Sequence, residues 1–301
     1  MRKVLFIVNP TAGQLRAKAG LMGILDAFVK NGLEPTVLVT QERGDARNWA
    51  YQAARGEIGP FERIIVCGGD GTLSEAVNGV MQGTPEGSRP IPLGYIPAGS
   101  TNDFAYGLGL PRDLSEAAEK AAAGEPRPLD IGHFNDRCFT YVASFGLFSE
   151  ASYATGQTAK NLFGHLAYLV EGAKELTRIR KYHVKMTADG ETIEGDYIYG
   201  SISNALSVGG ILKMDPRTVD LSDGKLEILL LKPFKSVDDV TAVLKVLATH
   251  NMKGNGIVYR QASEITVEMP NPENWSLDGE KCEAGRISEI RNVPGALEFV
   301  Y

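Results

Sequence analysis

Hydrophobic and polar residues follow two alternating patterns in the first part of the chain. Short continuous apolar runs, such as Ile64–Val66, are typical of buried strands, and the segments between them have apolar residues at helical spacing. The predicted strands are 4–8, 36–39, 63–67 and 93–96, and the predicted helices are 14–31, 45–54 and 73–81. Continuous apolar strands joined by helices indicate a parallel sheet covered on both faces. We therefore expect a doubly wound, Rossmann-like α/β domain.

The pattern changes after about residue 129. Four later segments, 182–186, 192–203, 226–231 and 265–267, are typical of strands, and turn pairs such as Asp189-Gly190 punctuate them. The short segment Gly124–Pro128 has two prolines and is the expected boundary. We predict an α/β domain over residues 1–128 and a mostly β domain over residues 129–289.

Composition narrows the class of protein. The 301 residues suggest two domains, and 31 Lys and Arg against 37 Asp and Glu give a net charge of −6, which does not favour nucleic acid as a partner. Cys67, Cys138 and Cys282 have no CxxC spacing, so we expect neither a disulfide framework nor a zinc site. That cysteine usage favours the cytoplasm. No apolar run is long enough for a transmembrane segment, so any membrane contact should be peripheral.

Three glycine-bearing loops follow predicted strands: Asn9–Gly13, Gly68–Thr72 and Pro97–Ala105. Open α/β sheets bind ligands beyond the carboxyl ends of their strands. The second loop has three glycines within four residues, and Thr72-Leu-Ser-Glu75 has the spacing of a capping box, which predicts a helix start that attracts phosphate. Asp70 would repel an anion unless Mg²⁺ lay between them, so a metal–nucleotide fits better than bare phosphate.

Alternatives remain open for these loops. The second could be a tight strand-to-helix turn without a ligand, and Asn9-Pro10 is also a common turn initiator. The second loop is neither a Walker A motif nor a GxGxxG dinucleotide fingerprint, and the protein kinase motifs are missing. Phosphoryl transfer would therefore need a different set of residues.

Taken together, the motifs Asn9-Pro-x-x-Gly13, Gly68-Gly-Asp-Gly-Thr72 and Gly99-x-x-Asn102-Asp-Phe-Ala105 resemble the diacylglycerol and sphingosine lipid kinase superfamily, most closely bacterial soluble diacylglycerol kinases. Further similar segments extend over nearly the whole chain: Asp130–Gly132, Lys160 with Gly164–Tyr168, Pro216–Leu226 and Leu277–Glu280. The resemblance implies a nucleotide-binding domain and a mostly antiparallel β-sandwich domain for the lipid, with an active site between them. It also implies that residues 290–301 return to the first domain.

The resemblance further implies that ATP and Mg²⁺ are used to phosphorylate a lipid alcohol at a membrane surface. The implied catalytic residues are Asp278 as general base, Glu280 and Lys160. The implied ATP-binding residues come from all the loops of the first domain: Asn9, Pro10, Thr11, Ala12, Gly13, Thr40, Gly69, Asp70, Gly71, Thr72, Leu73, Ser74, Glu75 and Ser100.

Two magnesium sites are implied in the same way. Asp70, Asp103 and Asp130 would hold the catalytic Mg²⁺, largely through water, and Asp220, Asp223 and the backbone carbonyl of Lys225 would hold a structural one. Each has a simpler alternative: Asp103 could cap a helix beginning near Phe104, residues 220–225 could form a hairpin turn, Asp278-Gly279 could be a β-turn, and Lys160 could be a solvated helix lysine.

Three functions remain open on the sequence. The leading one is an ATP-dependent lipid kinase, cytoplasmic and peripherally associated with the inner face of the membrane, for which a homodimer is compatible. The second is an NAD kinase or other small-molecule kinase, because NAD kinases share the GGDGT loop. The third is a nucleotide- and lipid-binding regulatory protein with weak catalysis. It is suggested by Gln14 and Tyr106, which stand where close relatives have basic residues.

Overall fold

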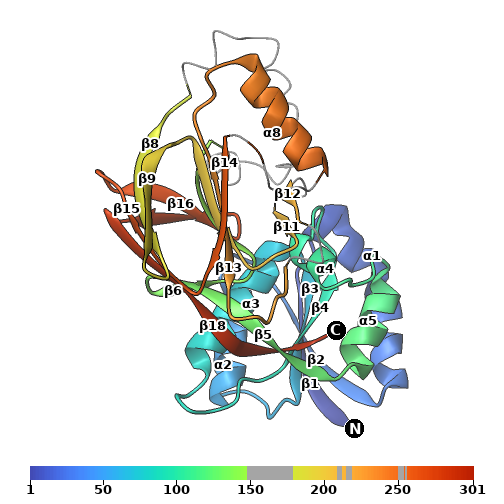
Figure 1. Cartoon of the computed structure of the whole chain (residues 1–301). Helices are drawn as coiled ribbons and strands as arrows, with labels where there is room; N and C mark the ends of the chain where they lie inside the picture. Colours follow the sequence, from blue (N-terminus) through green and yellow to red (C-terminus); the bar gives the residue numbers. More distant parts are fainter. Residues whose placement is uncertain (148–178, 209–211, 215–218, 250–253, 255) are drawn as a thin grey trace. The chain divides into compact units, whose positions relative to one another are not determined.

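The computed structural model describes residues 1–147, 179–208, 212–214, 219–249, 254 and 256–301 (Figure 1). The chain divides into two compact units. Unit 1 comprises Met1–Ile131 and Pro294–Tyr301, and unit 2 comprises Gly132–Val293. Among the described residues, none of the helices has the length and the apolar character needed to cross a membrane.

Unit 1 is built on a parallel sheet with strand order β2-β1-β3-β4. The last residues of β18 extend this sheet, because Phe299 and Val300 pair in parallel with β4. The strands are β1 (Arg2–Val8), β2 (Leu33–Val39), β3 (Arg63–Gly68), β4 (Leu93–Pro97) and β18 (Ile287–Val300). Every residue of β3 and β4 is buried, as expected for strands covered on both faces.

Helices cover both faces of this sheet (Figure 1). On one face α1 packs beside α5, and on the other α2 packs beside α3. The helices are α1 (Ala12–Lys30), α2 (Asp45–Arg55), α3 (Asp70–Gly83), the short α4 (Asp103–Gly107) and α5 (Leu114–Ala123). The rings of Phe6 on β1 and Phe28 on α1 meet edge to face, with centroids 5.0 Å apart, in the core between sheet and helices. The predicted doubly wound α/β domain is confirmed.

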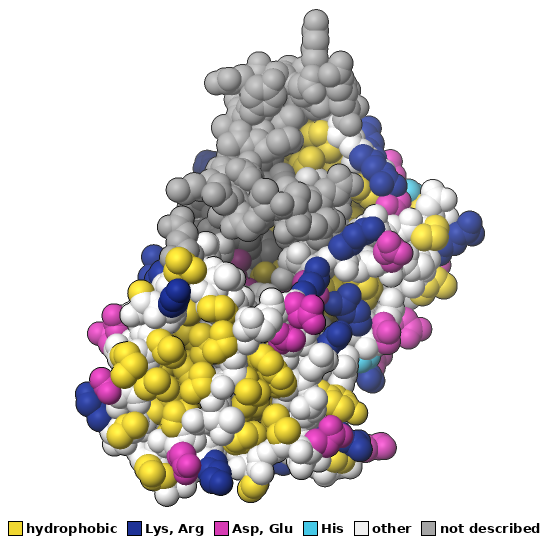
Figure 2. Space-filling view, turned by 180° about the vertical axis from the view of Figure 1, so that it is seen from behind, with side chains coloured by type: hydrophobic (Ala, Val, Ile, Leu, Met, Phe, Trp, Pro, Cys, Tyr) yellow, Lys and Arg dark blue, Asp and Glu magenta, His cyan; other side chains and the backbone are white. Residues whose placement is uncertain are grey.

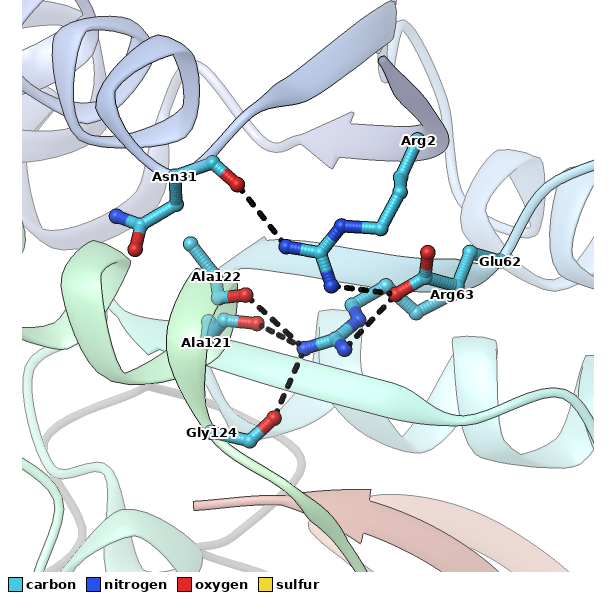
Figure 3. Close-up of polar contacts among 7 residues, drawn as sticks. All are labelled: Arg2, Asn31, Glu62, Arg63, Ala121, Ala122 and Gly124. Carbon is cyan, nitrogen blue, oxygen red and sulfur yellow. Dashed lines mark hydrogen bonds and ion pairs between the residues drawn. The ribbon is translucent and has the colours of Figure 1, made fainter.

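A buried arginine joins the sheet to the end of α5 (Figure 3). The guanidinium of Arg63 donates to the carbonyl oxygens of Ala121, Ala122 and Gly124 at 3.0, 3.3 and 3.1 Å. It also donates to the carboxylate of Glu62 at 3.0 Å. The last carbonyls of a helix have no intrahelical partners, and this end of the helix carries partial negative charge. The Arg63 guanidinium supplies hydrogen-bond donors for these carbonyls and a positive charge that offsets the negative one.

Unit 2 is a β-sandwich. Its larger sheet is antiparallel, with the strand order β14-β13-β10-β7-β16-β17. The strands of this sheet are β7 (Val142–Gly146), β10 (Tyr199–Ser203), β13 (Leu226–Leu231), β14 (Ile257–Ala262), β16 (Glu273–Leu277) and β17 (Glu280–Ala284). A second antiparallel group joins the first half of β18 to β15 (Glu264–Glu268), β8 (Tyr182–Ala188) and β9 (Glu191–Tyr197).

The remaining described elements are smaller or cross between units. They are β5 (Pro126–Phe134), β6 (Arg137–Phe139), β11 (Ser207–Val208), β12 (Leu212–Lys213) and α8 (Val237–Thr249). The core of unit 2 is aromatic at its centre, where Trp275 lies 4.9 Å from both Phe134 and Phe145 between ring centroids. The predicted antiparallel β-sandwich is confirmed.

Two local features differ from the sequence-based predictions. The predicted strand 192–203 is two strands in different sheets, broken at Ile198. Tyr197, Ile198 and Tyr199 are all buried, so the apolar run continues while the chain passes from one sheet to the other. The predicted boundary Gly124–Pro128 largely belongs to β5, which begins at Pro126. A proline is tolerated as the first residue of a strand, so the two prolines did not mark a linker.

Candidate active site

The first and second glycine-bearing loops flank the point where the strand order of unit 1 reverses. From β1 the chain goes outward to β2 on one side, and β3 and β4 follow on the other. Such switch points are where open α/β sheets bind ligands. The side chain of Asn9 crosses this point, because its Nδ2 donates to the Thr72 hydroxyl at 3.0 Å. Its Oδ1 accepts from the backbone N–H of Thr11, so Asn9 fixes both loops.

Glycines allow these loops to touch. Gly13 has a left-handed φ of +54°, and a Cβ there would lie 1.9 Å from the carbonyl oxygen of Ala98. A Cβ on Gly99 would lie 2.6 Å from Cα of Gly69. All three loops therefore meet backbone to backbone at the carboxyl edge of the sheet. Glycine is the residue type that permits both the φ and the close approach.

The second loop leads directly into α3, but the predicted capping box is wrong. The helix begins at Asp70 with Gly69 as its N-cap, and a glycine has no side chain with which to cap it. Thr72 instead serves as the acceptor for Asn9, and Glu75 accepts the backbone N–H of Gly44 at 2.9 Å. Glu75 thus holds the loop that follows Thr40 at the end of β2. The start of α3 faces the other loops with its N–H groups, which is the arrangement that binds anions.

Asp70 connects the second and third loops. Its Oδ2 accepts the N–H of Asp103 at 3.1 Å, and its Oδ1 accepts the N–H of Phe104 at 3.4 Å. Asp70 therefore caps α4, and the alternative that Asp103 does so is wrong. Both carboxylates face the buried Tyr95, whose pKa is raised by burial first and then by the charges of Asp70 and Asp103 among others. Asp70 and Asp103 thus lie together near the loop junction.

Asp130 is the third of the aspartates implied for the catalytic magnesium. It is buried on β5, and its Oδ1 accepts the N–H of Gly295 at 2.8 Å. The chain's last residues therefore pack on unit 1 beside this carboxylate. Within the described ranges, no three acidic, histidine or cysteine side chains are grouped closely enough to hold a metal ion directly. Asp70 and Asp103 thus lie together, and the described residues supply no direct three-carboxylate ligand set.

The remaining residues implied to contact ATP differ in whether their side chains are exposed. Ser100 is exposed in the third loop, and Thr11 is exposed before α1. The side chains of Leu73 and Ser74 are buried on α3, so these residues could contact a ligand through the backbone. The other implied residues lie in the first and second loops or at the ends of the helices that follow them: Pro10, Ala12 and Gly71.

Asp278 is the most constrained carboxylate in unit 2. It lies in the tight turn between β16 and β17, with a φ of 50°, and it is 3% exposed. Its Oδ2 accepts from the backbone N–H and the hydroxyl of Thr140 at 2.7 and 2.8 Å. Its Oδ1 accepts from the N–H groups of Tyr141 and Val142 at 3.0 and 3.1 Å. The β-turn and a fixed carboxylate are therefore both present.

The protonation of Asp278 reflects two opposing effects. Burial raises the pKa of Asp278 above its usual 3.8, and the donors from Thr140, Tyr141 and Val142 act to lower it. Desolvation is the larger effect. A carboxylate with a raised pKa is a stronger base, and one held by four hydrogen bonds has a fixed direction.

Two further residues, Glu280 and Lys160, are implied to be catalytic. Glu280 begins β17, is partly exposed, and forms an ion pair with Arg137 at 3.3 Å. Lys160 lies outside the described residues.

The implied structural magnesium site lies in one exposed turn before β13. Asp220 Oδ1 accepts the N–H of Ser222 at 3.0 Å, and Asp223 Oδ1 accepts the N–H of Lys225 at 3.0 Å. The hairpin alternative is wrong, because β12 pairs with β11 whereas β13 pairs with β10 and β14. Two carboxylates and a carbonyl in one turn are oxygen donors of the kind Mg²⁺ takes, with water completing its shell.

Sequence reasoning missed two residues beside these sites. Glu227 is fully buried on β13, near Asp223, and burial raises its pKa to about 8. The sequence signal that could have found Glu227 is its place as a charged residue within the apolar run Leu226–Leu231. Thr140 holds Asp278, and no sequence pattern marked it, because the two residues are far apart in the chain.

Comparison with known proteins identifies relatives of both units. Residues 3–134 match the family model described as the diacylglycerol kinase catalytic domain, and residues 142–301 match the YegS C-terminal NAD kinase beta sandwich-like domain. The chain is 34% identical to a diacylglycerol kinase of Bacillus subtilis (strain 168), over 93% of this chain and 90% of that protein. It is 29% identical to a diacylglycerol kinase of Staphylococcus carnosus (strain TM300), over 93% and 89% respectively. A crystal structure of a diacylglycerol kinase from Bacillus anthracis str. Sterne superposes with a TM-score of 0.74 at 26% identity, covering 100% of this chain and 97% of that one.

Proposed function

Because this chain belongs to the diacylglycerol kinase family, a family of lipid kinases, we propose that it transfers the γ-phosphoryl group of ATP to the hydroxyl of diacylglycerol or a related lipid alcohol. The junction of three glycine-bearing loops at the switch point of unit 1 is the observation that carries this proposal. The acceptor is a membrane component, so we place the reaction at the inner face of the cytoplasmic membrane.

Unit 1 holds ATP in this proposal. The phosphates lie against the backbone of Gly69 and Gly71 at the start of α3, where N–H groups and the helix dipole favour anions. Asn9 and Thr72 support this position, because their mutual hydrogen bond fixes the first loop against α3. The loop from Thr40 to Gly44, held by Glu75, forms one side of the nucleotide site.

Mg²⁺ accompanies ATP, with Asp70 and Asp103 nearest to it. Both oxygens of Asp70 already accept an N–H from α4, and a carboxylate has about four acceptor positions, so contact through water fits the geometry. When bound, Mg²⁺ neutralises the phosphate charge that develops during transfer. Asp130 accepts the N–H of Gly295, and it contributes negative charge from β5.

Asp278 acts as the general base. The hydroxyl oxygen of the acceptor attacks the γ-phosphorus, the bond to the β,γ-bridging oxygen breaks, and ADP leaves. The proton of the hydroxyl passes to the carboxylate of Asp278, whose raised pKa favours this step. The rotatable hydroxyl of Thr140 gives up its hydrogen bond to Oδ2 and so leaves a lone pair for this proton. Glu280, two residues later, lies beside it at the start of β17, and Lys160 offsets part of the negative charge.

A structural Mg²⁺ binds to Asp220, Asp223 and the carbonyl of Lys225. Its test is the thermal unfolding of the D220A/D223A variant in MgCl₂ and in EDTA. The wild type should gain stability from Mg²⁺, and the variant should gain none, because a ligand stabilises only the state that binds it. An equal gain in both proteins would remove the metal from this turn.

One observation favours a second candidate, an NAD kinase. Residues 142–301 match a domain described as NAD kinase beta sandwich-like, and the GGDGT loop occurs in NAD kinases. The test is ADP release from Mg-ATP with detergent-dispersed diacylglycerol, sphingosine, polyprenol or phosphatidylglycerol, beside NAD and a control without acceptor. Release with one lipid supports the lipid kinase, whereas release with NAD alone supports the second candidate. Binding of ATP and lipid without any release would contradict both and indicate a regulatory protein.

A further inference from the structure

The surface of unit 1 has two features that the proposed chemistry does not use. Figure 2 shows one of them, a face on which hydrophobic side chains gather, and the described residues do not show what covers it. The other is a cavity of about 720 Å³ within unit 1. Its walls come from the end of α2, the segments that lead into β3, β4 and β5, and the strand β18. A volume of this size is typical of sites that bind small molecules.

The cavity lies at the end of the sheet opposite to the three glycine-bearing loops. Phe61 and Glu62 come just before β3, and Pro92 comes just before β4, whereas the second and third loops follow these same strands. Strand β3 has six residues, and at about 3.3 Å per residue its two ends lie roughly 16 Å apart. A ligand in the cavity is therefore separate from a nucleotide held by the loops.

Much of the lining is apolar and rigid. Phe61, Ile91 and four prolines line the cavity, and two of the prolines, Pro90 and Pro92, flank Ile91. A proline ring loses no side-chain entropy when a ligand packs on it, so these walls keep their shape with and without a ligand. An apolar or aromatic group matches this part of the cavity, because packing it against such walls removes apolar surface from water.

One lining carboxylate is buried and only partly satisfied. Glu298 of β18 is 7% exposed, and its Oε1 accepts from Nε and Nη2 of Arg89 at 2.8 and 2.7 Å. Its Oε2 is also buried and accepts no hydrogen bond within the described part of the chain. A buried carboxylate oxygen without a donor is costly, so a ligand that brings an N–H or O–H group to it is favoured.

The charged groups around Glu298 favour a cation over an anion. Two arginines and three glutamates line the cavity, which gives it a net charge of −1. Both arginines already have carboxylate partners, because Arg89 bonds to Glu298 and Arg55 pairs with Glu57 at 3.7 Å. An anionic ligand would have to compete with one of these pairs and would lie beside Glu298.

Glu62 is a less suitable anchor than Glu298. Its Oε1 accepts from Arg2 at 3.1 Å and from Arg63 at 3.0 Å, and Figure 3 shows both guanidinium groups on the same oxygen. Its side chain is 36% exposed, so water reaches it. Oε2 of Glu298 is therefore the carboxylate oxygen of the lining that gains most from a ligand.

The end of α2 adds to the negative potential of the cavity. Residues 53–56 belong to the lining, and this end of a helix carries partial negative charge. The N–H groups that follow α2 donate to the carbonyls of Gln52 and Ala53. No N–H of the described backbone reaches the carbonyls of Ala54 and Arg55, so both can accept a hydrogen bond from a bound cation.

We propose that this cavity binds a small molecule that carries a protonated primary amine on an apolar or aromatic body. The ammonium group donates to Oε2 of Glu298, and the end of α2 contributes favourable potential. The body of the ligand packs against Phe61, Ile91 and the prolines. An ammonium group has three donors and no acceptor, so it matches a wall that presents oxygens. This site lies at the amino-terminal edge of the sheet and is distinct from the one proposed for ATP.

Three probes with similar bodies and different charges test the proposal in the full-length wild type. They are 4-phenylbutylammonium, the uncharged 4-phenylbutan-1-ol and the anion 4-phenylbutyrate, each titrated at neutral pH into ¹⁵N-labelled protein while amide chemical shifts are followed. The ammonium probe should shift the amide signals of Phe61, Ile91 and Glu298, and it should bind at least about tenfold more tightly than either other probe. No binding of the ammonium probe, equal or tighter binding of another probe, or shifts confined to residues outside the lining would overturn the proposal.

Two variants test the anchor and the cavity separately. E298Q keeps the size of the side chain and removes its charge, so it should weaken binding of the ammonium probe at least about tenfold. I91W fills the cavity and should weaken that binding as well, although Glu298 is unchanged. E116Q makes the same charge change at an exposed glutamate of α5 outside the lining, and it should bind the probe like the wild type.

Thermal unfolding of each variant shows whether it is folded, and the comparison of probes in the wild type decides even where a variant is not. Undiminished binding of the ammonium probe by folded E298Q would overturn the proposal. So would an equal loss of binding in E298Q and E116Q, because Glu116 does not line the cavity.

Discussion

Replacing Asp278 with Asn tests the carboxylate on which the proposed chemistry depends. The amide keeps one acceptor oxygen and gains a donor NH₂ group. The side chain will best place its oxygen toward the N–H groups of Tyr141 and Val142, which cannot accept a hydrogen bond. The NH₂ group then faces Thr140, whose hydroxyl can rotate to accept while its backbone N–H cannot. One buried N–H group is therefore left without an acceptor.

The expected loss of stability follows from this count. One unsatisfied buried donor costs about 1–3 kcal/mol, and the two bonds kept by the amide oxygen are weaker because they lose the negative charge. Removing a desolvated charge offsets part of this cost, since burial raises the pKa of Asp278. We expect D278N to lower the free energy of unfolding by about 1–3 kcal/mol in urea at neutral pH. Stability equal to or above that of the wild type would contradict the reasoning.

The pH dependence has a definite sign. A raised pKa means that folded Asp278 binds its proton more tightly than the unfolded chain does. Its contribution to stability is therefore full below the usual value of 3.8 and is lost as the pH rises through the folded pKa. D278N lacks this titration, so the stability of the wild type relative to the variant should fall across that window.

Catalysis and stability are separated by a second variant. T140V removes the hydroxyl donor but leaves the carboxylate and its charge, and it should cost about 1–2 kcal/mol in stability. If Asp278 is the general base, D278N should lower kcat by about 10²–10⁴, whereas T140V should retain most activity. Equal loss of activity in both variants, in proportion to their stability, would reduce Asp278 to a structural role.

Three further substitutions test other parts of the account. G13A should lower the affinity for ATP in isothermal titration, and it should lower the free energy of unfolding by about 2 kcal/mol or more, because its Cβ would overlap the Ala98 carbonyl. G32A is the control: it is also at positive φ but in open space, so it should cost only about 1 kcal/mol. R63M should cost about 3 kcal/mol in urea unfolding, because it leaves the carbonyls at the end of α5 without their donor. H183Q should lower the melting temperature more at about pH 5.5 than at about pH 8.5. Two carboxylates of β9 raise the pKa of His183, so their interaction with the protonated ring stabilises the fold at low pH and is lost as the pH rises through this pKa.

Much of the fold could be predicted because hydrophobic periodicity reports burial directly. The apolar run from Leu226 to Leu231 has the same bounds as β13, and helix 45–54 differs from α2 by one residue at its end. The prediction of one strand over 192–203 was wrong although it used the same signal, continuous burial, as the correct ones. Burial continues through Ile198 while the partner strands change, and periodicity carries no information about partners.

The candidate site was predictable where backbone conformation demands glycine. The loops were visible because they contain glycines, and at Gly13 and Gly99 the glycine permits a contact that a Cβ would prevent. Hydrogen bonds between distant segments were not visible. The carboxylate of Asp70 accepts a hydrogen bond from the start of α4, and Thr140 donates to Asp278 across 138 positions of the chain. Such pairs depend on tertiary packing, which no local spacing encodes.

Transfer of labelled γ-phosphate from ATP to a lipid tests the central claim most directly. The measurement uses diacylglycerol in mixed micelles with MgCl₂, separates the lipid product, and compares the wild type with D278N and T140V. The account predicts a labelled phospholipid with the wild type and with T140V, and a loss of at least about a hundredfold with D278N. No labelled lipid from the wild type with any lipid alcohol, or undiminished labelling with D278N, would contradict it.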